Sequence, residues 1–261
     1  FYKYEREKWE APLLEYQDLT ESDNNFVSEY VFSYSPSHET DDGAQCLEQF
    51  AGEVTAQIET DGRLTAYETS IFSGRLTAFD FGGHLYAPLI HVKQDGLNLQ
   101  VSPVSLNRDE KGFVDLLKQY SDANPAVLKG KNLYLLRNKS KTGMGFFEAG
   151  NFYPDFILWI DTPKIQYVSF IDPKGLLRVT PDDPKIQFYK TIKGLEARLQ
   201  PTAGDKQIIL NSFILSGTKS AELRAWWKME RPEREARHVF CLDNDGCVER
   251  MIERIMEDPN G

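Results

Sequence analysis

The sequence predicts an α/β fold in which a mixed β-sheet is flanked by helices, preceded by an N-terminal α+β region. Short runs rich in β-branched and aromatic residues alternate with amphipathic segments in the second half of the chain. With 261 residues, 41% of them hydrophobic, the chain can bury a substantial core. A boundary near Ser105 is expected to divide residues 1–105, an acidic linker region, from residues 106–261, the main domain.

The N-terminal region is expected to contain a helix followed by strands. Residues 1–40 are acidic and aromatic with weak periodicity, so a helix with an irregular stretch and an arm packed on another module remain alternatives. Apolar residues recur at helical spacing over 45–59, which predicts a helix. The pattern then changes to β. Gly82-Gly83 predicts a hairpin turn, and the alternation over 97–101 predicts a further strand.

The main domain is expected to alternate helices and strands. Residues 107–120 combine acids in the first turn with an apolar stripe, which predicts an amphipathic helix. The elements predicted after it are strands over 133–137, 156–160 and 167–171, a helix that begins at Asp182-Asp183-Pro184, a strand over 206–215, a helix over 220–228, a strand over 238–242 and a helix over 247–256. The buried face of the helix that begins near Pro184 is expected to consist of Ile186, Tyr189, Ile192 and Leu195.

Strands 156–160 and 167–171 are close enough in the chain to form a buried hairpin. The linker 161–166 is polar and contains proline, as a turn requires. A hairpin that is symmetric about Pro163-Lys164 pairs residues whose numbers sum to 163 + 164 = 327. A register shifted by one residue would move every side chain to the opposite face.

The predicted register brings two acids to the open end of the hairpin. Asp155 would stand opposite Asp172, with Cβ atoms roughly 4.5–5.5 Å apart, and Lys174 would project from the same face. Two facing carboxylates repel each other unless a cation or a proton lies between them, and oxygen ligands with room for water suit Mg²⁺. We therefore predict a Mg²⁺-dependent phosphodiesterase in which Asp155, Asp172 and the Pro173 carbonyl hold the metal. Lys174 would orient water and stabilise charge on the attacked phosphate.

Either motif alone, Pro154-Asp155 or Asp172-Pro173-Lys174, is common in ordinary turns, and only their combination supports the phosphodiesterase hypothesis.

Four segments around these motifs are similar to a known family: YLLRN at 134–138, GMGFF at 143–147, NFYPDFILW at 151–159 and FIDPKGL at 170–176. Together they resemble a PD-(D/E)xK nuclease domain. More narrowly, they resemble the domain at the C-terminus of DEAD/DEAH-box helicases related to the restriction subunit of type III restriction enzymes.

This resemblance spans roughly residues 80–245. It implies a restriction-endonuclease-like fold that cleaves DNA with Mg²⁺, and a role in restriction or defence. It also implies that Asp155 and Asp172 are metal ligands and that Lys174 is the catalytic lysine. The middle acid is Asp where Glu is commoner in the family.

A third acid is often contributed by the helix that precedes the sheet in such nucleases. Glu110, at the start of the predicted helix, is our candidate, with a solvated residue that stabilises the helix dipole as the alternative. Glu148 is the rival candidate. Lys185 and Gln187 could contact phosphate, or could simply face solvent.

The net charge of −10 is unevenly distributed. Residues 1–61 hold 15 acidic and 3 basic side chains, a net of −12, and the other residues hold 25 acidic and 27 basic side chains, a net of +2. A strong phosphate-binding stripe is absent from the sequence, so we expect a partner module to supply most of the affinity for DNA. No P-loop motif occurs, and the first residue is not Met. The chain is therefore expected to be the C-terminal piece of a longer protein whose helicase/ATPase region precedes it, with a methyltransferase or specificity subunit as a further partner.

Other features bear on location and on a rival function. Three cysteines without a metal-binding pattern, no apolar run long enough to span a membrane and no signal peptide favour a cytoplasmic protein. Cys241 and Cys247 are expected to be free, and His238 to be structural. Trp226-Trp227, beside basic residues, could stack on bases or pack in the core. The rival function is a catalytically inactive module that keeps the nuclease fold to bind DNA or to dock on the helicase.

Overall fold

The structure is a computed structural model that describes residues 29–34, 43–57, 68–71, 76–85, 89–93, 99–139, 143–146, 149, 152–199 and 206–257. The predicted mixed α/β class is confirmed. The first elements in chain order are β1 (Val31–Tyr34), α2 (Gly43–Gln57), β2 (Glu68–Ile71), β3 (Leu76–Phe79), β4 (Leu89–Val92) and β5 (Leu99–Ser102). They are followed by α3 (Arg108–Ala123), α4 (Pro125–Leu128), β6 (Asn132–Arg137), β7 (Phe156–Asp161), β8 (Ile165–Lys174), α5 (Pro184–Leu199), β9 (Gln207–Ser216), α6 (Ser220–Trp227), α7 (Arg231–Ala236), β10 (Val239–Cys241) and α8 (Cys247–Met256).

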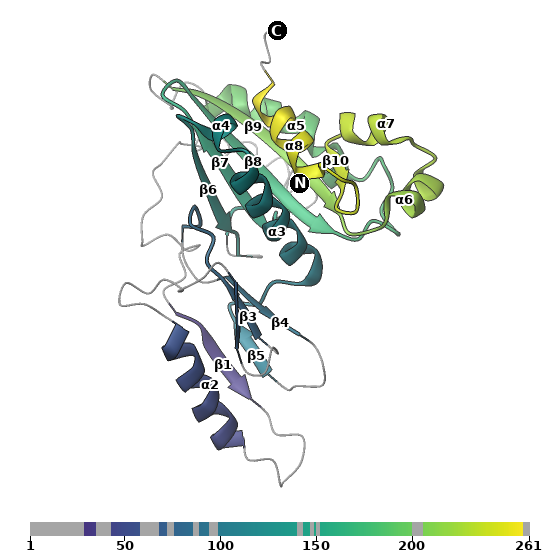
Figure 1. The fold of residues 1–261 in the computed structure, drawn as a ribbon. Coiled ribbons are helices and arrows are strands. Elements are labelled where there is room, and N and C mark those ends of the chain that lie inside the picture. The colour runs from purple at the N-terminus through teal and green to yellow at the C-terminus, as the bar shows by residue number, and fades with distance from the viewer. Residues whose placement is uncertain are drawn as a thin grey trace, which may run out of the picture.

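A five-stranded mixed sheet forms the centre of the larger part of the molecule (Figure 1). Its strand order is β10-β9-β8-β7-β6. Strands β6, β7 and β8 pair in antiparallel fashion, whereas β8, β9 and β10 are parallel. The parallel half needs helical crossovers, and α5 connects β8 to β9 while α6 and α7 connect β9 to β10.

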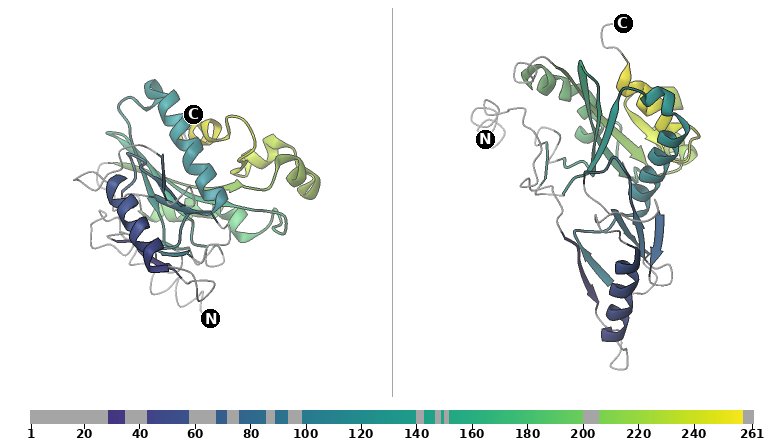
Figure 2. Two further views of the ribbon diagram at one scale, coloured as in Figure 1. Left: turned by 60° about the horizontal axis from the view of Figure 1, so that its bottom comes forward. Right: turned by 60° about the vertical axis from the view of Figure 1, so that its left-hand side comes forward.

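Helices cover both faces of this sheet, with α3 and α8 on one side and α5 on the other (Figure 2). On the α3 side, the ring of Phe113 lies 5.3 Å from that of Phe156. On the α5 side, Phe146 packs between Phe170 and Phe188, with ring centroids 4.6 Å apart in each pair. Successive strand residues face opposite sides of a sheet. The α5 side therefore carries residues 157 and 159 of β7, residues 170 and 172 of β8, and Asp155, which directly precedes β7.

A smaller part of the molecule precedes α3 and is built from two short antiparallel sheets and α2 (Figure 1). Strand β1 pairs with β5, and β3 lies between β2 and β4. Its own small core consists of Phe50, Leu76, Ala78 and Ile90. Tyr30 packs against both this cluster and the main core, so it bridges the two.

The hairpin predicted at Gly82-Gly83 is wrong. A turn does occur there, but β3 pairs with β4, and His84 instead forms a parallel bridge with Leu135 of β6. Gly83 lies so close to the Leu133 carbonyl oxygen that a Cβ atom would collide with it. The glycine therefore permits a close approach to β6 and does not close a two-residue hairpin.

Most other elements lie within a few residues of their predicted bounds, and α8 matches them. Strand β1 was not predicted, nor were the short helices α4 and α7, and residues 1–28 and 35–40 lie outside the described residues. In α5, Ile186 and Ile192 are buried as predicted. Phe188 is also buried, because its ring joins the aromatic cluster of the α5 side, whereas Tyr189 and Leu195 are half-buried. No helix among the described residues is long and apolar enough to cross a membrane.

Candidate active site

The β7–β8 hairpin has the predicted register. Phe156 pairs with Ile171 at one end and Asp161 with Gln166 at the other, so paired numbers sum to 327 as expected. Asp155 and Asp172 follow directly after the last pair, on the same face of the sheet. Asp172 is 7% exposed and Asp155 is half-buried.

Two prolines explain why the ladder ends where the acids stand. The Thr162 N–H donates to the Ile165 carbonyl at 2.9 Å, which marks a hydrogen-bonded pair. Such pairs recur every second residue in an antiparallel ladder, so the next one after Phe156 and Ile171 would join Pro154 to Pro173. Neither proline has an N–H to donate. The strands therefore separate here, and the two aspartates occupy the narrow, non-hydrogen-bonded position, where opposite side chains lie closest.

Asp155 and Asp172 interact directly. Burial raises the pKa of Asp155 to about 8, and the negative charges of Asp172 and Glu110 and a hydrogen bond with Asp172 act in the same direction. The two facing carboxyl groups therefore hold a proton more tightly than two separate aspartates would. A carboxyl group whose pKa is raised by burial and by a neighbouring carboxylate is a candidate for a functional site, because a cation could take the place of the proton.

Lys174 and Pro173 flank the same point. The Lys174 ammonium forms an ion pair with the Asp172 carboxylate and lies 5.4 Å from the centre of the Phe152 ring. The Lys174 carbonyl accepts a hydrogen bond from the Gly217 N–H at 3.0 Å, so it faces β9. Because successive carbonyls of a strand point in opposite directions, the Pro173 carbonyl faces the β7 side.

Glu110 reaches the site from the start of α3. Its carboxylate accepts a hydrogen bond from the Asn107 backbone N–H at 2.9 Å, and the Asn107 side chain accepts from the Glu110 N–H, which completes a capping box. Burial raises the pKa of Glu110, Arg137 opposes this, and the charge of Asp172 adds to it. The alternative in which Glu110 is a solvated residue is wrong, since it is 5% exposed, although it does cap the helix.

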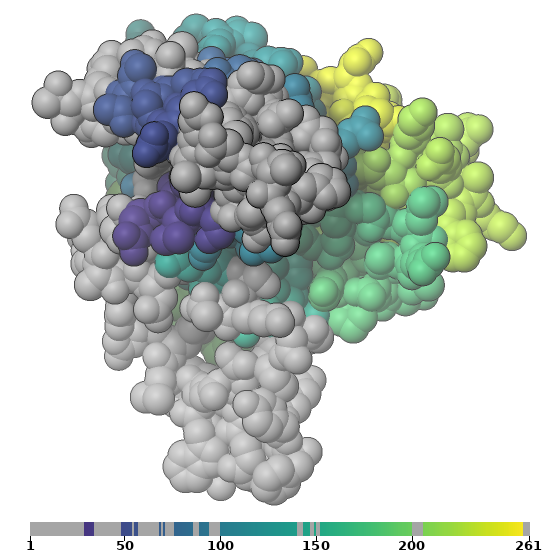
Figure 3. Space-filling view, turned by 90° about the horizontal axis from the view of Figure 1, so that it is seen from below, coloured from purple at the N-terminus to yellow at the C-terminus, as the bar shows by residue number. Residues whose placement is uncertain are grey.

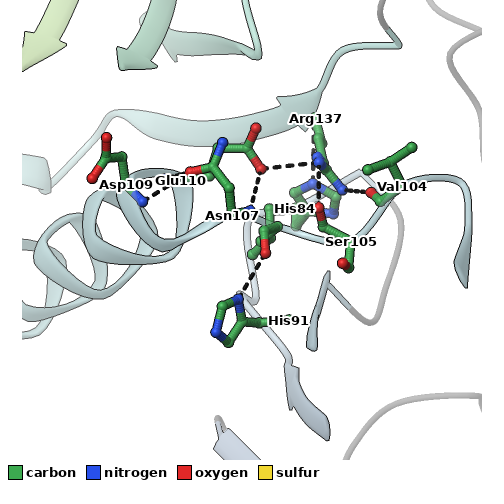
Figure 4. Close-up of polar contacts among 9 residues, drawn as sticks. His84, His91, Val104, Ser105, Asn107, Asp109, Glu110 and Arg137 are labelled. Atoms are coloured by element: carbon green, nitrogen blue, oxygen red, sulfur yellow. Dashed lines mark hydrogen bonds and ion pairs between the residues drawn. The ribbon is translucent and has the colours of Figure 1, made fainter. Parts of the chain in front are cut away.

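Arg137, at the end of β6, holds Glu110 in place (Figure 4). Its guanidinium donates to Glu110 Oε2 at 2.9 Å, to the Ser105 carbonyl at 3.1 Å and to the Val104 carbonyl. A single cation thus joins the α3 helix start, the preceding linker and the sheet. The backbone N–H of Arg137 donates to His84 Nε2 at 3.2 Å.

Asn138 supports the other acid. Its backbone N–H donates to the Asp155 carbonyl, and its side-chain amide donates to the Pro154 carbonyl, both at 2.8 Å. We did not predict a role for Arg137 or Asn138, although both lie in the 134–138 segment of the nuclease resemblance. The capping box was also missed, and Asn107 three residues before Glu110 is its sequence signature.

The other predicted site residues are Lys185, Gln187 and Glu148. Lys185 lies 6.0 Å from the centre of the Phe152 ring, the ring that Lys174 also approaches. Gln187 donates to the Pro181 carbonyl at 2.7 Å, so its amide is used within its own helix start. Glu148, the rival third acid, lies outside the described residues.

The loop between β9 and α6 is a strand-to-helix turn. At the start of α6 the Asp243 carboxylate accepts from the Ser220 N–H at 3.0 Å. His238 has a structural role, since it stacks on Phe213 with 4.6 Å between ring centroids. Cys241 and Cys247 are free and buried.

The donor set of the site suits a hard cation. Three carboxylates (Glu110, Asp155, Asp172) face two cations (Arg137, Lys174), so full ionisation leaves 2 − 3 = −1. Among the described residues, no three His, Cys, Asp or Glu side chains form a complete metal cage. Mg²⁺ in proteins is commonly bound by only one or two carboxylates plus water, so the pair Asp155 and Asp172 fits it.

Comparison of the chain with protein-family models, with curated proteins and with solved structures finds no match. The nuclease family therefore stays a prediction that depends on the four sequence segments and on the local geometry. The mixed five-stranded sheet and the clustering of its acids are structural findings that do not depend on that family.

Proposed function

We propose that this chain is a Mg²⁺-dependent DNA endonuclease domain with a restriction-endonuclease-like fold, acting within a restriction or defence helicase-nuclease. The observation that supports it most is the pairing of Asp155 with Asp172 at the open end of one hairpin, with Lys174 bound to Asp172 and the charge of Glu110 acting on Asp155. A turn or a docking surface gains nothing from two facing acids, because the charged form of one is disfavoured by the other.

The roles follow from position. Asp155 and Asp172, with the Pro173 carbonyl, would hold the metal, which when bound neutralises phosphate charge and lowers the pKa of a water molecule. Lys174 stabilises the negative charge that develops on the attacked phosphate and helps to orient the water. Glu110 is fixed by Arg137 at the edge of the same site, where it keeps the pKa of Asp155 high until a cation enters.

The substrate and partners follow from charge. A net of +2 over residues 62–261 is weak for a protein that binds DNA alone. A helicase/ATPase region, with a methyltransferase or specificity subunit, would supply affinity and sequence choice.

A second candidate is a module that keeps this fold without cutting DNA. It is favoured by the ion pairs that already occupy Asp172 and Glu110 and by the absence of a complete three-acid cage among the described residues. In this case Asp155, Asp172 and Lys174 would be dispensable for DNA binding or docking.

Plasmid cleavage with Mg²⁺ separates the two candidates. We expect Asp172→Asn and Lys174→Ala to lose cleavage by roughly 100-fold or more, the usual effect of removing a group that stabilises transition-state charge. Asp161→Asn, on the same strand pair at its turn end, is the matched control and should cut as the wild type does. Equal cleavage by all four proteins would overturn the nuclease proposal.

A further inference from the structure

An exposed surface lies directly after Lys174, formed by residues 177–179 and 224–228; we call it the β8–α6 surface. Figure 1 shows α6 beyond the sheet, near the end of β8, and Figure 3 shows the yellow-green C-terminal segment projecting beside the green atoms that follow β8. Two large apolar side chains are exposed on it, Leu177 at 58% and Trp226 at 55%. Single exposed apolar residues are common on protein surfaces, so the feature that marks this surface is an exposed indole together with cations.

The surface is held rigidly to the candidate active site. The Leu176 N–H donates to Thr218 Oγ1 at 2.8 Å, and the Leu176 side chain is fully buried. Trp227 is buried, and its indole N–H donates to the Val179 carbonyl at 2.8 Å. The same carbonyl lies 3.4 Å from the indole nitrogen of Trp226. These contacts fix Trp226 next to the loop that leaves Lys174.

The charge of the surface is opposite to that of the whole chain. Residues 177–179 and 224–228 contain three basic side chains and no acidic one, a net of +3, whereas the chain carries −10. Arg178, Arg224 and Lys228 are exposed beside the two apolar residues. Lys228 ends α6 in the left-handed conformation (φ 53°), and its backbone N–H donates to the Arg224 carbonyl at 2.8 Å.

We infer that the β8–α6 surface binds a single-stranded DNA segment next to the cleavage site, with Trp226 stacked on a base and Arg178 and Lys228 facing phosphates. An exposed indole between cations is the arrangement that single-stranded nucleic-acid sites use. A duplex keeps its base faces stacked, so it offers no partner to the Trp226 ring. The inference deepens the proposed nuclease function, because it gives the substrate an unpaired segment at the point where it is cut.

Fluorescence anisotropy with a labelled oligo(dT) tests the inference without cleavage, in EDTA and in the Asp172→Asn background. We expect Trp226→Ala to weaken binding by roughly 10-fold, Trp226→Phe to retain most of it, and Arg178→Ala to weaken it with a smaller dependence on salt. Tyr134→Ala is the control, because Tyr134 is 41% exposed on β6, away from this surface. It should bind as the Asp172→Asn parent does.

Three outcomes overturn the inference: no binding of oligo(dT) by the parent protein, equal binding by the parent and Trp226→Ala, or an equal loss of duplex and single-stranded binding in Trp226→Ala. A melting curve for Trp226→Ala that matches the parent excludes misfolding, and Trp226→Phe provides the same comparison with an aromatic ring kept. The nuclease proposal can fail separately. If binding depends on Trp226 but cleavage does not depend on Asp172, the single-strand surface is supported and the proposed catalytic site is wrong.

Discussion

The two ends of the β7–β8 hairpin carry acids on the same face of the sheet, but the charge of each acid is compensated in a different way. At the turn end, Asp161 stands opposite the neutral Gln166, and its carboxylate lies 2.7 Å from the Lys206 ammonium. At the open end, Asp155 stands opposite a second acid, Asp172, and the pKa of Asp155 is raised to about 8. One carboxylate is neutralised by one cation, whereas the other shares a proton with its neighbour.

The turn end is a stabilising ion pair, whereas the open end has the properties of a ligand-binding site. The turn end is complete as it stands, because charge and hydrogen bonds are satisfied within the chain. At the open end the charged form of Asp155 is disfavoured beside Asp172, and a divalent cation between the two carboxyl groups would favour it. Asp161 and Lys206 therefore supply matched controls for every test of the open end.

The largest effect on stability is expected from the cation that holds Glu110. Arg137→Ala leaves a buried carboxylate unpaired, and we expect it to lower the free energy of unfolding by about 3–5 kcal/mol. Lys206→Ala breaks a half-exposed pair and should cost less than about 1 kcal/mol. Urea denaturation measures both. Similar losses in the two variants would show that Arg137 is an ordinary surface cation.

The pH dependence of stability should distinguish Asp155 from Asp161. The folded-state pKa of Asp155 lies near 8, above its unfolded value near 4, so the folded protein holds a proton that the unfolded chain releases. Its contribution to stability is present at low pH and is lost as pH rises toward 8.

We therefore expect Asp155→Asn, without divalent cations, to be more stable than the wild type at pH 8 by about 2 kcal/mol, with a smaller gain at pH 5. Asp161→Asn should show no such gain. Thermal melts at the two pH values measure this, and a gain that is independent of pH would contradict the assigned proton.

The smallest effect is expected at the helix cap that positions Glu110. Asn107→Ala removes the side-chain acceptor of the capping box and should lower stability by about 1 kcal/mol. Asn107→Ser or Asn107→Asp should restore most of it. Loss of cleavage in Asn107→Ala with no change in stability would indicate that Asn107 itself contacts the substrate.

The hairpin register could be predicted from sequence because a polar turn between two apolar runs leaves few alternatives. The pairing of Asp155 with Asp172 follows from it, and the two prolines make the same position the end of the ladder. Local patterns were enough for this part of the site.

The support of the third acid could not be predicted in the same way. Glu110 and Arg137 are separated by 27 residues, and their contact depends on how α3 crosses the end of β6. Likewise, Gly82-Gly83 is a valid local turn signal, but pairing of His84 with Leu135 overrides it. Long-range packing decides both cases, and no spacing in the sequence encodes it.

Cation-dependent thermal stability in the absence of DNA tests the central claim most directly. At Mg²⁺ or Ca²⁺ concentrations about 100-fold above the dissociation constant, linkage predicts about 2.7 kcal/mol of stabilisation, a rise in Tm of roughly 5–10 °C. We predict this rise for the wild type and for Asp161→Asn, larger at pH 8 than at pH 6 because the cation displaces the Asp155 proton, and no rise for Asp155→Asn. An unchanged Tm in the wild type, or an equal rise in Asp155→Asn, would contradict a metal site between Asp155 and Asp172.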